Sequence, residues 1–81
     1  MKVTVYSTPT CPWCKKTKEF LEEKNVKFSD IDVSSNQEEA QKMIAKSGQM
    51  GVPVTAIEKD DGSEEIIIGF DEKAFKKELG I

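Results

Sequence analysis

Residues 6–14 have the sequence YSTPTCPWC, and this stretch decides the fold. It joins an apolar strand pattern over Lys2–Tyr6 to an amphipathic helix pattern that continues to about Lys24. Cys11 and Cys14 are the only cysteines of the chain, and they stand where the strand gives way to the helix. A CxxC pair in this position is typical of redox proteins.

The start of the helix gives the two cysteines different roles. A helix N-terminus carries partial positive charge and unpaired N–H groups, which stabilise a thiolate. Pro12 suits the first helical position, so Cys11 is expected at the N-cap with its sulfur facing those donors. Cys14 lies one turn further in, close enough to bond to Cys11 but more shielded. We therefore expect Cys11 to be the nucleophile and Cys14 its disulfide partner.

A group of lysines follows the cysteines directly. Positive charge in the first turn is unfavourable for a helix but favourable for a nearby thiolate, and a local rule broken beside a reactive residue points to function. The group consists of Lys15, Lys16 and Lys18. We expect these side chains to help hold the thiolate.

Two alternatives to redox chemistry use the same cysteines. A purely structural disulfide would close so small a loop that it would stabilise the chain only slightly. A zinc site needs four ligands, and a chain with two cysteines and no histidine would need a second chain or outside ligands to supply them. Both alternatives are weaker than redox catalysis.

The length of the chain predicts one domain. A domain of this size, 81 residues, buries only about 60% of the surface of its unfolded chain, which leaves room for a single core. We therefore expect one domain over residues 1–81. No stretch approaches the ~18 apolar residues of a membrane span, and the N-terminus lacks the apolar segment of a signal peptide. These features predict a cytoplasmic protein that does not bind a membrane, and we expect a monomer.

The charge pattern excludes several functions. The net charge is -3, from 15 acidic residues and 12 lysines, with no arginine and no histidine. There is no basic stripe to follow a phosphate backbone, which argues against nucleic-acid binding. Without histidine there is no Cys-His protease dyad. Thiol–disulfide exchange needs neither histidine nor arginine.

The middle of the chain contains a second strand and a second helix. The apolar residues of Val26–Val33 predict the strand, although their alternation switches face between Phe28 and Ile31, which indicates a bulge or an early end. Ser35 and Glu38 have the spacing of a capping box. The helix that follows should stop at Gly48 and bury a stripe formed by Ala40, Met43, Ile44 and Ser47. On its exposed side, we expect Glu38 to pair with Lys42.

The last third of the chain predicts a hairpin and a final helix. A third strand opens in Gly51–Val54, and a turn at Asp60–Gly62 leads to a fourth strand over Glu64–Ile68. The acidic residues around this turn are those expected of an exposed sheet edge. Asp71 should cap the last helix, with Phe70 and Phe75 placed to form a hydrophobic staple across the cap, and that helix docks through Ala74, Phe75 and Leu79.

The order of elements is therefore βαβ, α, a ββ hairpin and α. A right-handed βαβ unit followed by an antiparallel pair gives an α/β fold, in which a four-stranded mixed sheet is flanked by three helices. This is the minimal thioredoxin fold.

Three stretches of the chain resemble small bacterial glutaredoxins. They are YSTPTCPWC at residues 6–14, Gly51-Val52-Pro53-Val54 and Ile68-Gly69-Phe70, and the resemblance covers nearly the whole chain. It implies a thiol–disulfide oxidoreductase in which Pro12 and Trp13 complete the active-site loop. It also implies a cis Pro53 that faces Cys11. Because Trp13 is held between the two cysteines and does not belong to the buried side of the helix, we expect it in a docking patch for a disulfide-bearing partner.

The resemblance also implies where substrate or glutathione would bind. The backbone of Val52 would pair with an extended peptide or with glutathione by strand-like hydrogen bonds. The residues implied for this site are Lys15, Val52, Pro53, Gly69 and Phe70. Glutathione would act as the reducing co-substrate, and disulfide-containing proteins would be the partners. No permanently bound cofactor and no metal is expected.

Two positions depart from the usual glutaredoxin pattern. Thr8 stands where many glutaredoxins have a lysine or arginine, and Phe70 follows Gly69 where many have a second glycine. Gly-Phe resembles the glutaredoxin-like electron donors of ribonucleotide reductase, which take electrons from thioredoxin reductase. Such a donor is the first alternative function. An iron–sulfur or metal-binding dimer that uses Cys11 is the second.

Overall fold

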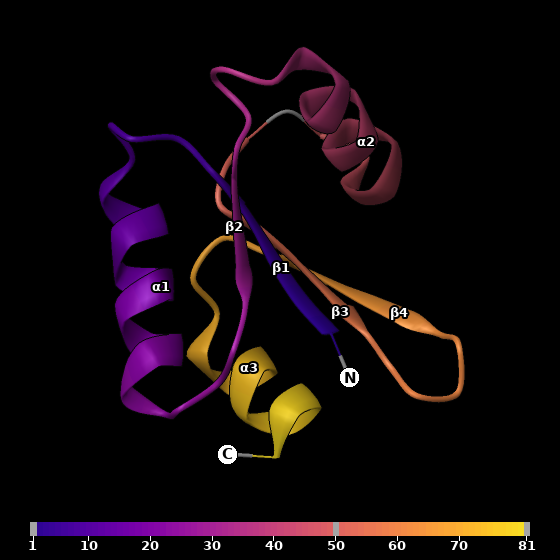
Figure 1. Ribbon diagram of the computed structural model, residues 1–81. Helices are drawn as coiled ribbons and strands as arrows, with labels where there is room; N and C mark the ends of the chain where they lie inside the picture. The colour runs from indigo at the N-terminus through magenta and orange to yellow at the C-terminus, as the bar shows by residue number, and fades with distance from the viewer. Residues whose placement is uncertain (1, 50, 81) are drawn as a thin grey trace.

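A four-stranded mixed sheet with three helices forms the fold (Figure 1). The computed structural model describes residues 2–49 and 51–80. The elements are β1 (Lys2–Ser7), α1 (Pro12–Glu23), β2 (Ser29–Asp32), α2 (Gln37–Ser47), β3 (Val54–Glu58), β4 (Glu64–Ile68) and α3 (Glu72–Leu79). The strand order is β2-β1-β3-β4, with β1 parallel to β2 and antiparallel to β3, and β4 antiparallel to β3. The predicted fold class is confirmed, and β1 is central as expected.

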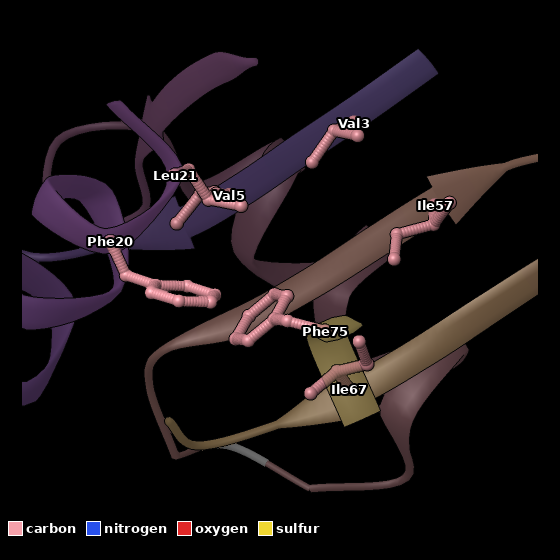
Figure 2. Packing of buried hydrophobic residues seen from close by; sticks show 7 residues of the cluster. All are labelled: Val3, Val5, Phe20, Leu21, Ile57, Ile67 and Phe75. Atoms are coloured by element: carbon pink, nitrogen blue, oxygen red, sulfur yellow. The ribbon is translucent and has the colours of Figure 1, made fainter. Parts of the chain in front are cut away.

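Alternation along the strands divides the core between the two faces of the sheet. One face packs against α1 and α3 (Figure 2), and its cluster contains Val3, Val5, Phe20, Leu21, Ile57, Ile67 and Phe75. The other face packs against α2 through Tyr6, Met43, Val54 and Ala56. The amphipathic pattern predicted for α1 is confirmed, because the helix buries Cys14, Thr17, Phe20 and Leu21. This packing fixes the start of α1 against the carboxyl end of β1.

Three phenylalanine rings join α1, α3 and the loop before α3. The ring of Phe20 meets that of Phe70 edge-on, with centroids 5.7 Å apart. The rings of Phe70 and Phe75 have centroids 6.3 Å apart across the N-cap of α3. The side chain of Asp71 caps that helix by accepting from the Ala74 N–H at 3.2 Å. The predicted cap and hydrophobic staple are therefore confirmed.

The second strand is shorter than predicted. The apolar pattern predicted Val26–Val33, but the strand covers only Ser29–Asp32. After α1 the chain turns at Asn25, with a φ of 58°, and the Val26 N–H bonds back to the Leu21 carbonyl at 2.9 Å. Residues 26–28 therefore close the end of the helix before strand pairing begins. The switch of face predicted a bulge or an early end, but the main departure from the prediction is this late start.

The predicted capping box of α2 is wrong. The N-cap is Asn36, whose side chain accepts from the Glu39 N–H at 3.2 Å, and the Ser35 hydroxyl bonds back into the preceding turn instead. Asparagine is as good an N-cap as serine, so Asn36 can cap the helix one residue later than predicted. The predicted ion pair shifts as well, since Lys42 pairs with Glu39 at 3.3 Å rather than with Glu38. The helix ends at a left-handed glycine, as predicted.

Candidate active site

Cys11 occupies the N-cap of α1. Its sulfur accepts a hydrogen bond from the Cys14 N–H at 3.2 Å, and Pro12 takes the first turn, as the sequence predicted. Both cysteines are free thiols. The Cys11 side chain is half-buried, so a substrate can reach it, and Cys14 is fully buried behind it.

A cis peptide bond lies beside Cys11. Val52 and Pro53 are joined in the cis form, as the resemblance implied. The Cys11 thiol donates to the Val52 carbonyl with a sulfur–oxygen distance of 3.8 Å, although 41 residues separate the two in sequence. The loop before β3 therefore supplies backbone groups next to the exposed thiol.

A shallow hollow of about 270 Å³ extends from this loop. It is lined by Trp13, Val52, Pro53, Gly69 and Phe70. Trp13 forms the exposed rim, with 56% of its surface accessible. Four of the five residues implied for glutathione or substrate thus lie together, and the backbone holds them there, since the Gly69 N–H bonds to the Pro53 carbonyl at 2.8 Å. Such a mostly apolar hollow beside the Val52 backbone suits an extended peptide.

The fifth residue, Lys15, lies elsewhere. It lines a different hollow with Lys18 and Asp30. The other lysines of the group have partners of their own: the Lys16 ammonium lies 4.8 Å from the centre of the Trp13 ring, and that of Lys18 lies 3.0 Å from an Asp30 oxygen. The three lysines therefore do not converge on one atom.

The two thiols differ in their electrostatics. The pKa of Cys14 is raised from 9.0 to about 12, mainly by burial and also by the hydrogen bond and charge of Cys11. The Thr8 backbone N–H and the Lys18 ammonium act in the opposite direction. In the dithiol state Cys14 therefore keeps its proton at neutral pH, and Cys11 is the accessible sulfur.

Comparison with known proteins agrees with this geometry. The Glutaredoxin family model matches residues 3–61, which is more than half of the chain. The chain belongs to the glutaredoxin family.

Individual relatives extend the likeness over nearly the whole chain. A glutaredoxin-like 8.6 kDa protein in the rubredoxin operon of Clostridium pasteurianum is 48% identical over 75 residues, which cover 93% of each chain. A mutant of the thioredoxin-like protein BC3987 has a similar structure, with a TM-score of 0.86, 30% identity and coverage of 99% of this chain and 96% of that one. NrdH-redoxin from Escherichia coli, a glutaredoxin-like protein with a thioredoxin-like activity profile, has a TM-score of 0.79 at 26% identity, with 95% and 93% covered. Members of this family are thiol oxidoreductases.

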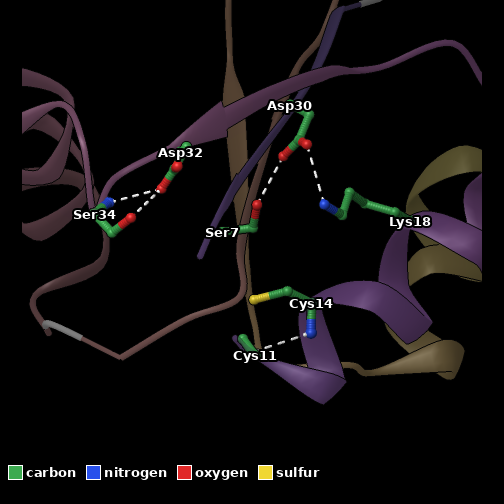
Figure 3. A network of polar contacts seen from close by, with 7 residues as sticks. All are labelled: Ser7, Cys11, Cys14, Lys18, Asp30, Asp32 and Ser34. Atoms are coloured by element: carbon green, nitrogen blue, oxygen red, sulfur yellow. Dashed lines mark hydrogen bonds and ion pairs between the residues drawn. The ribbon is translucent and has the colours of Figure 1, made fainter. Parts of the chain in front are cut away.

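Sequence reasoning missed a polar network beside the cysteines (Figure 3). The buried hydroxyl of Ser7 donates to Asp30 at 2.7 Å, and Asp30 pairs with Lys18. One signal was available: Ser7 has the same parity as Val3 and Val5, whose side chains face α1. A serine in that row should have prompted a search for its partner.

Neither a cluster of metal-binding side chains nor a membrane-spanning helix is found in the described residues. Across residues 2–49 and 51–80, no three histidine, cysteine or acidic side chains come together as a metal site. No helix in the same ranges is long and apolar enough to cross a membrane.

Proposed function

We propose that this protein reduces protein disulfides or glutathione mixed disulfides through Cys11 and Cys14, working as a monomer with residues 1–81 as one domain. The observation that carries the proposal is the contrast between the two thiols. Cys11 is accessible at a helix N-terminus beside the cis proline, and Cys14 is buried one turn behind it. A reactive thiol backed by a shielded one is the arrangement that two-step disulfide exchange needs.

The reaction proceeds in two steps. The Cys11 thiolate attacks one sulfur of the substrate disulfide, forms a mixed disulfide and releases the other sulfur as a thiolate. The N–H groups at the start of α1 stabilise the charge on Cys11 before the attack. Cys14 then attacks Cys11, which closes a Cys11–Cys14 disulfide and releases the second substrate thiol. With a glutathionylated substrate, free glutathione can instead attack the mixed disulfide at Cys11.

The hollow beside Cys11 supports binding of an extended substrate. Backbone groups of Val52 and Gly69 lie next to the apolar surface of Trp13 and Phe70. A tripeptide such as glutathione, or a segment of a protein substrate, would pair with the Val52 backbone and place its sulfur at Cys11. Because the dithiol must be kept reduced, we place the protein in the cytoplasm.

A second electron source is also supported. Phe70 stands where many glutaredoxins have glycine, and it adds an aromatic side chain to the lining of the hollow. The similar NrdH-redoxin has a thioredoxin-like activity profile. Reduction by thioredoxin reductase is therefore the alternative to reduction by glutathione.

One assay tests both the activity and the electron source. We would follow NADPH-dependent turnover of a small mixed disulfide, once with glutathione and glutathione reductase and once with thioredoxin reductase alone. Turnover only with glutathione assigns the hollow to the tripeptide, and turnover only with thioredoxin reductase assigns it to a protein. No turnover with either would refute the proposed function.

Two matched variants test the assigned roles. Cys11→Ser should abolish turnover under every condition. Cys14→Ser, the same substitution three residues away, should keep glutathione-dependent turnover of glutathionylated substrates but lose reduction of protein disulfides. Substantial activity in Cys11→Ser would overturn its assignment as nucleophile.

A further inference from the structure

The polar network beside Cys14 has no role in the reaction as described so far. Its members come from three elements: Ser7 at the end of β1, Asp30 on β2 and Lys18 on α1. Asp30 pairs in register with Val5, so it shares the face of the sheet that α1 covers. The Ser7 hydroxyl and the Lys18 ammonium occupy different oxygens of the Asp30 carboxylate, at 2.7 and 3.0 Å. This arrangement binds the Lys18 ammonium to a carboxylate on the side of the sheet that α1 covers.

The bound Lys18 ammonium acts electrostatically on the Cys14 thiol. Lys18 follows Cys14 by four residues on α1, so the two side chains lie on the same side of the helix. The Thr8 N–H, which hydrogen-bonds to Cys14, belongs to the residue after Ser7. In Figure 3 the Cys14 side chain extends from the start of α1 toward the end of the strand that carries Ser7, and the Lys18 side chain extends from the same helix toward Asp30. The Lys18 charge lowers the pKa of Cys14, against the effect of burial.

The second step of the proposed reaction needs such a charge. The Cys14 thiol must lose its proton to solvent before its sulfur attacks Cys11. Once Cys11 is in a mixed disulfide it carries neither proton nor charge, so its own effects on the Cys14 thiol disappear. Burial then opposes ionisation, and the Thr8 N–H and Lys18 remain to favour it.

We propose that Lys18, anchored by Asp30 and Ser7, is a positioning residue for the second half-reaction. It keeps a positive charge beside Cys14 while the thiolate forms, attacks the Cys11 sulfur and displaces the substrate sulfur as a thiolate. This inference rests on the proposed function. It adds a role for Lys18 to the roles already assigned to Cys11 and Cys14.

The other ionisable groups around Cys14 do not take this role. At the N-cap of α1, Cys11 raises the pKa of Cys14. Lys15 directly follows Cys14 on the helix, so the two side chains do not face each other. On β2, Asp30 is bound to Lys18, and the Asp32 carboxylate accepts from the backbone and hydroxyl of Ser34. Lys18 is the cation that the network binds.

Ellman's reagent separates the two steps in one experiment. Cys11 attacks this small disulfide and releases one coloured thiolate, and Cys14 then displaces the second coloured thiolate from the mixed disulfide. The first phase depends on reagent concentration, whereas the second is intramolecular. We would record both phases by stopped flow from pH 6 to 10, for the unchanged protein and for Lys18→Met, Lys18→Arg and Lys42→Met.

The expected change is confined to the second phase. If the Lys18 charge favours the Cys14 thiolate about tenfold, which corresponds to ~1.4 kcal/mol, its removal lowers the thiolate fraction by that factor. A thiolate of higher pKa is the better nucleophile, so each remaining thiolate attacks about threefold faster, which offsets part of the loss. Lys18→Met should therefore slow the second phase about threefold at neutral pH and move its pH profile to higher pH.

The controls decide the interpretation. Lys18→Arg keeps the charge and should stay near the rate of the unchanged protein. Lys42→Met removes an ion-paired lysine on α2, away from the cysteines, and should change neither phase. An unchanged second phase and pH profile in Lys18→Met, or equal slowing in Lys42→Met, would overturn the inference. Absence of the first phase in the unchanged protein would overturn the proposed function and this inference with it.

Discussion

The hydroxyl of Thr55 is buried in the core without a hydrogen-bond partner among the described residues. Thr55 lies on β3 between Val5 of β1 and Ile67 of β4, and its exposed fraction is 0%. An unsatisfied buried hydroxyl costs about 1–3 kcal/mol. Valine has nearly the same shape and a branched side chain that suits a strand. Thr55→Val should therefore raise the free energy of unfolding by about 1 kcal/mol, or the melting temperature by about 4–8 °C.

Thr17 provides a matched control for this substitution. It is equally buried, but its hydroxyl donates to the Trp13 carbonyl at 3.0 Å. Thr17→Val loses that bond and should destabilise the fold by about 0.5–1 kcal/mol, opposite in sign to Thr55→Val. Urea unfolding followed by circular dichroism, with excess reductant to keep both cysteines as thiols, measures both changes. Destabilisation by Thr55→Val comparable to that by Thr17→Val would refute the reasoning.

Three further predictions concern the caps and the buried thiol. Phe70→Ala removes a half-buried ring of the aromatic cluster and should cost about 2 kcal/mol in urea unfolding; no loss would show that the ring packing adds nothing. Asn36→Ala should lower the free energy of unfolding by about 1 kcal/mol and Ser35→Ala by only a few tenths. The reverse order would show that Ser35, and not Asn36, caps α2. Because burial raises the pKa of Cys14 to about 12, the folded state keeps a proton that the unfolded state loses above pH 9. The reduced protein should then lose stability from about pH 9 to 12, by at most about 1.4 kcal/mol per pH unit from this thiol, and an equally steep slope in Cys14→Ser would contradict this origin.

Local sequence rules predicted the elements that position the cysteines. Pro12 after Cys11 specifies a helix start on its own, because a fixed φ and a missing N–H suit that position and few others. The staple formed by Phe70 and Phe75 across Asp71 is equally local. Where two residues compete for one role, the local rule is not decisive, and at α2 it selected Ser35 when Asn36 forms the cap.

Contacts between distant residues could not be predicted in this way. The family resemblance implies Lys15 as part of the glutathione site, but its angular position on α1 directs it to another hollow. The bond from Ser7 to Asp30 depends on the register of β1 against β2, which the apolar pattern did not define because β2 begins three residues later than predicted. The cis form of Pro53 came from the family resemblance, since only about 5–6% of such bonds are cis.

The two contacts of Phe70 limit what its identity says about the electron source. Its ring packs on Phe20 and Phe75, and the same residue lines the hollow beside Trp13. A phenylalanine here is therefore explained by the packing of α3 alone, without a docking protein. The presence of Phe70 in place of the second glycine of many glutaredoxins is therefore weaker evidence for reduction by thioredoxin reductase than the sequence alone suggests. The choice between glutathione and thioredoxin reductase depends instead on whether a tripeptide fits the hollow between Val52 and the Phe70 ring, which the two-reductase assay measures directly.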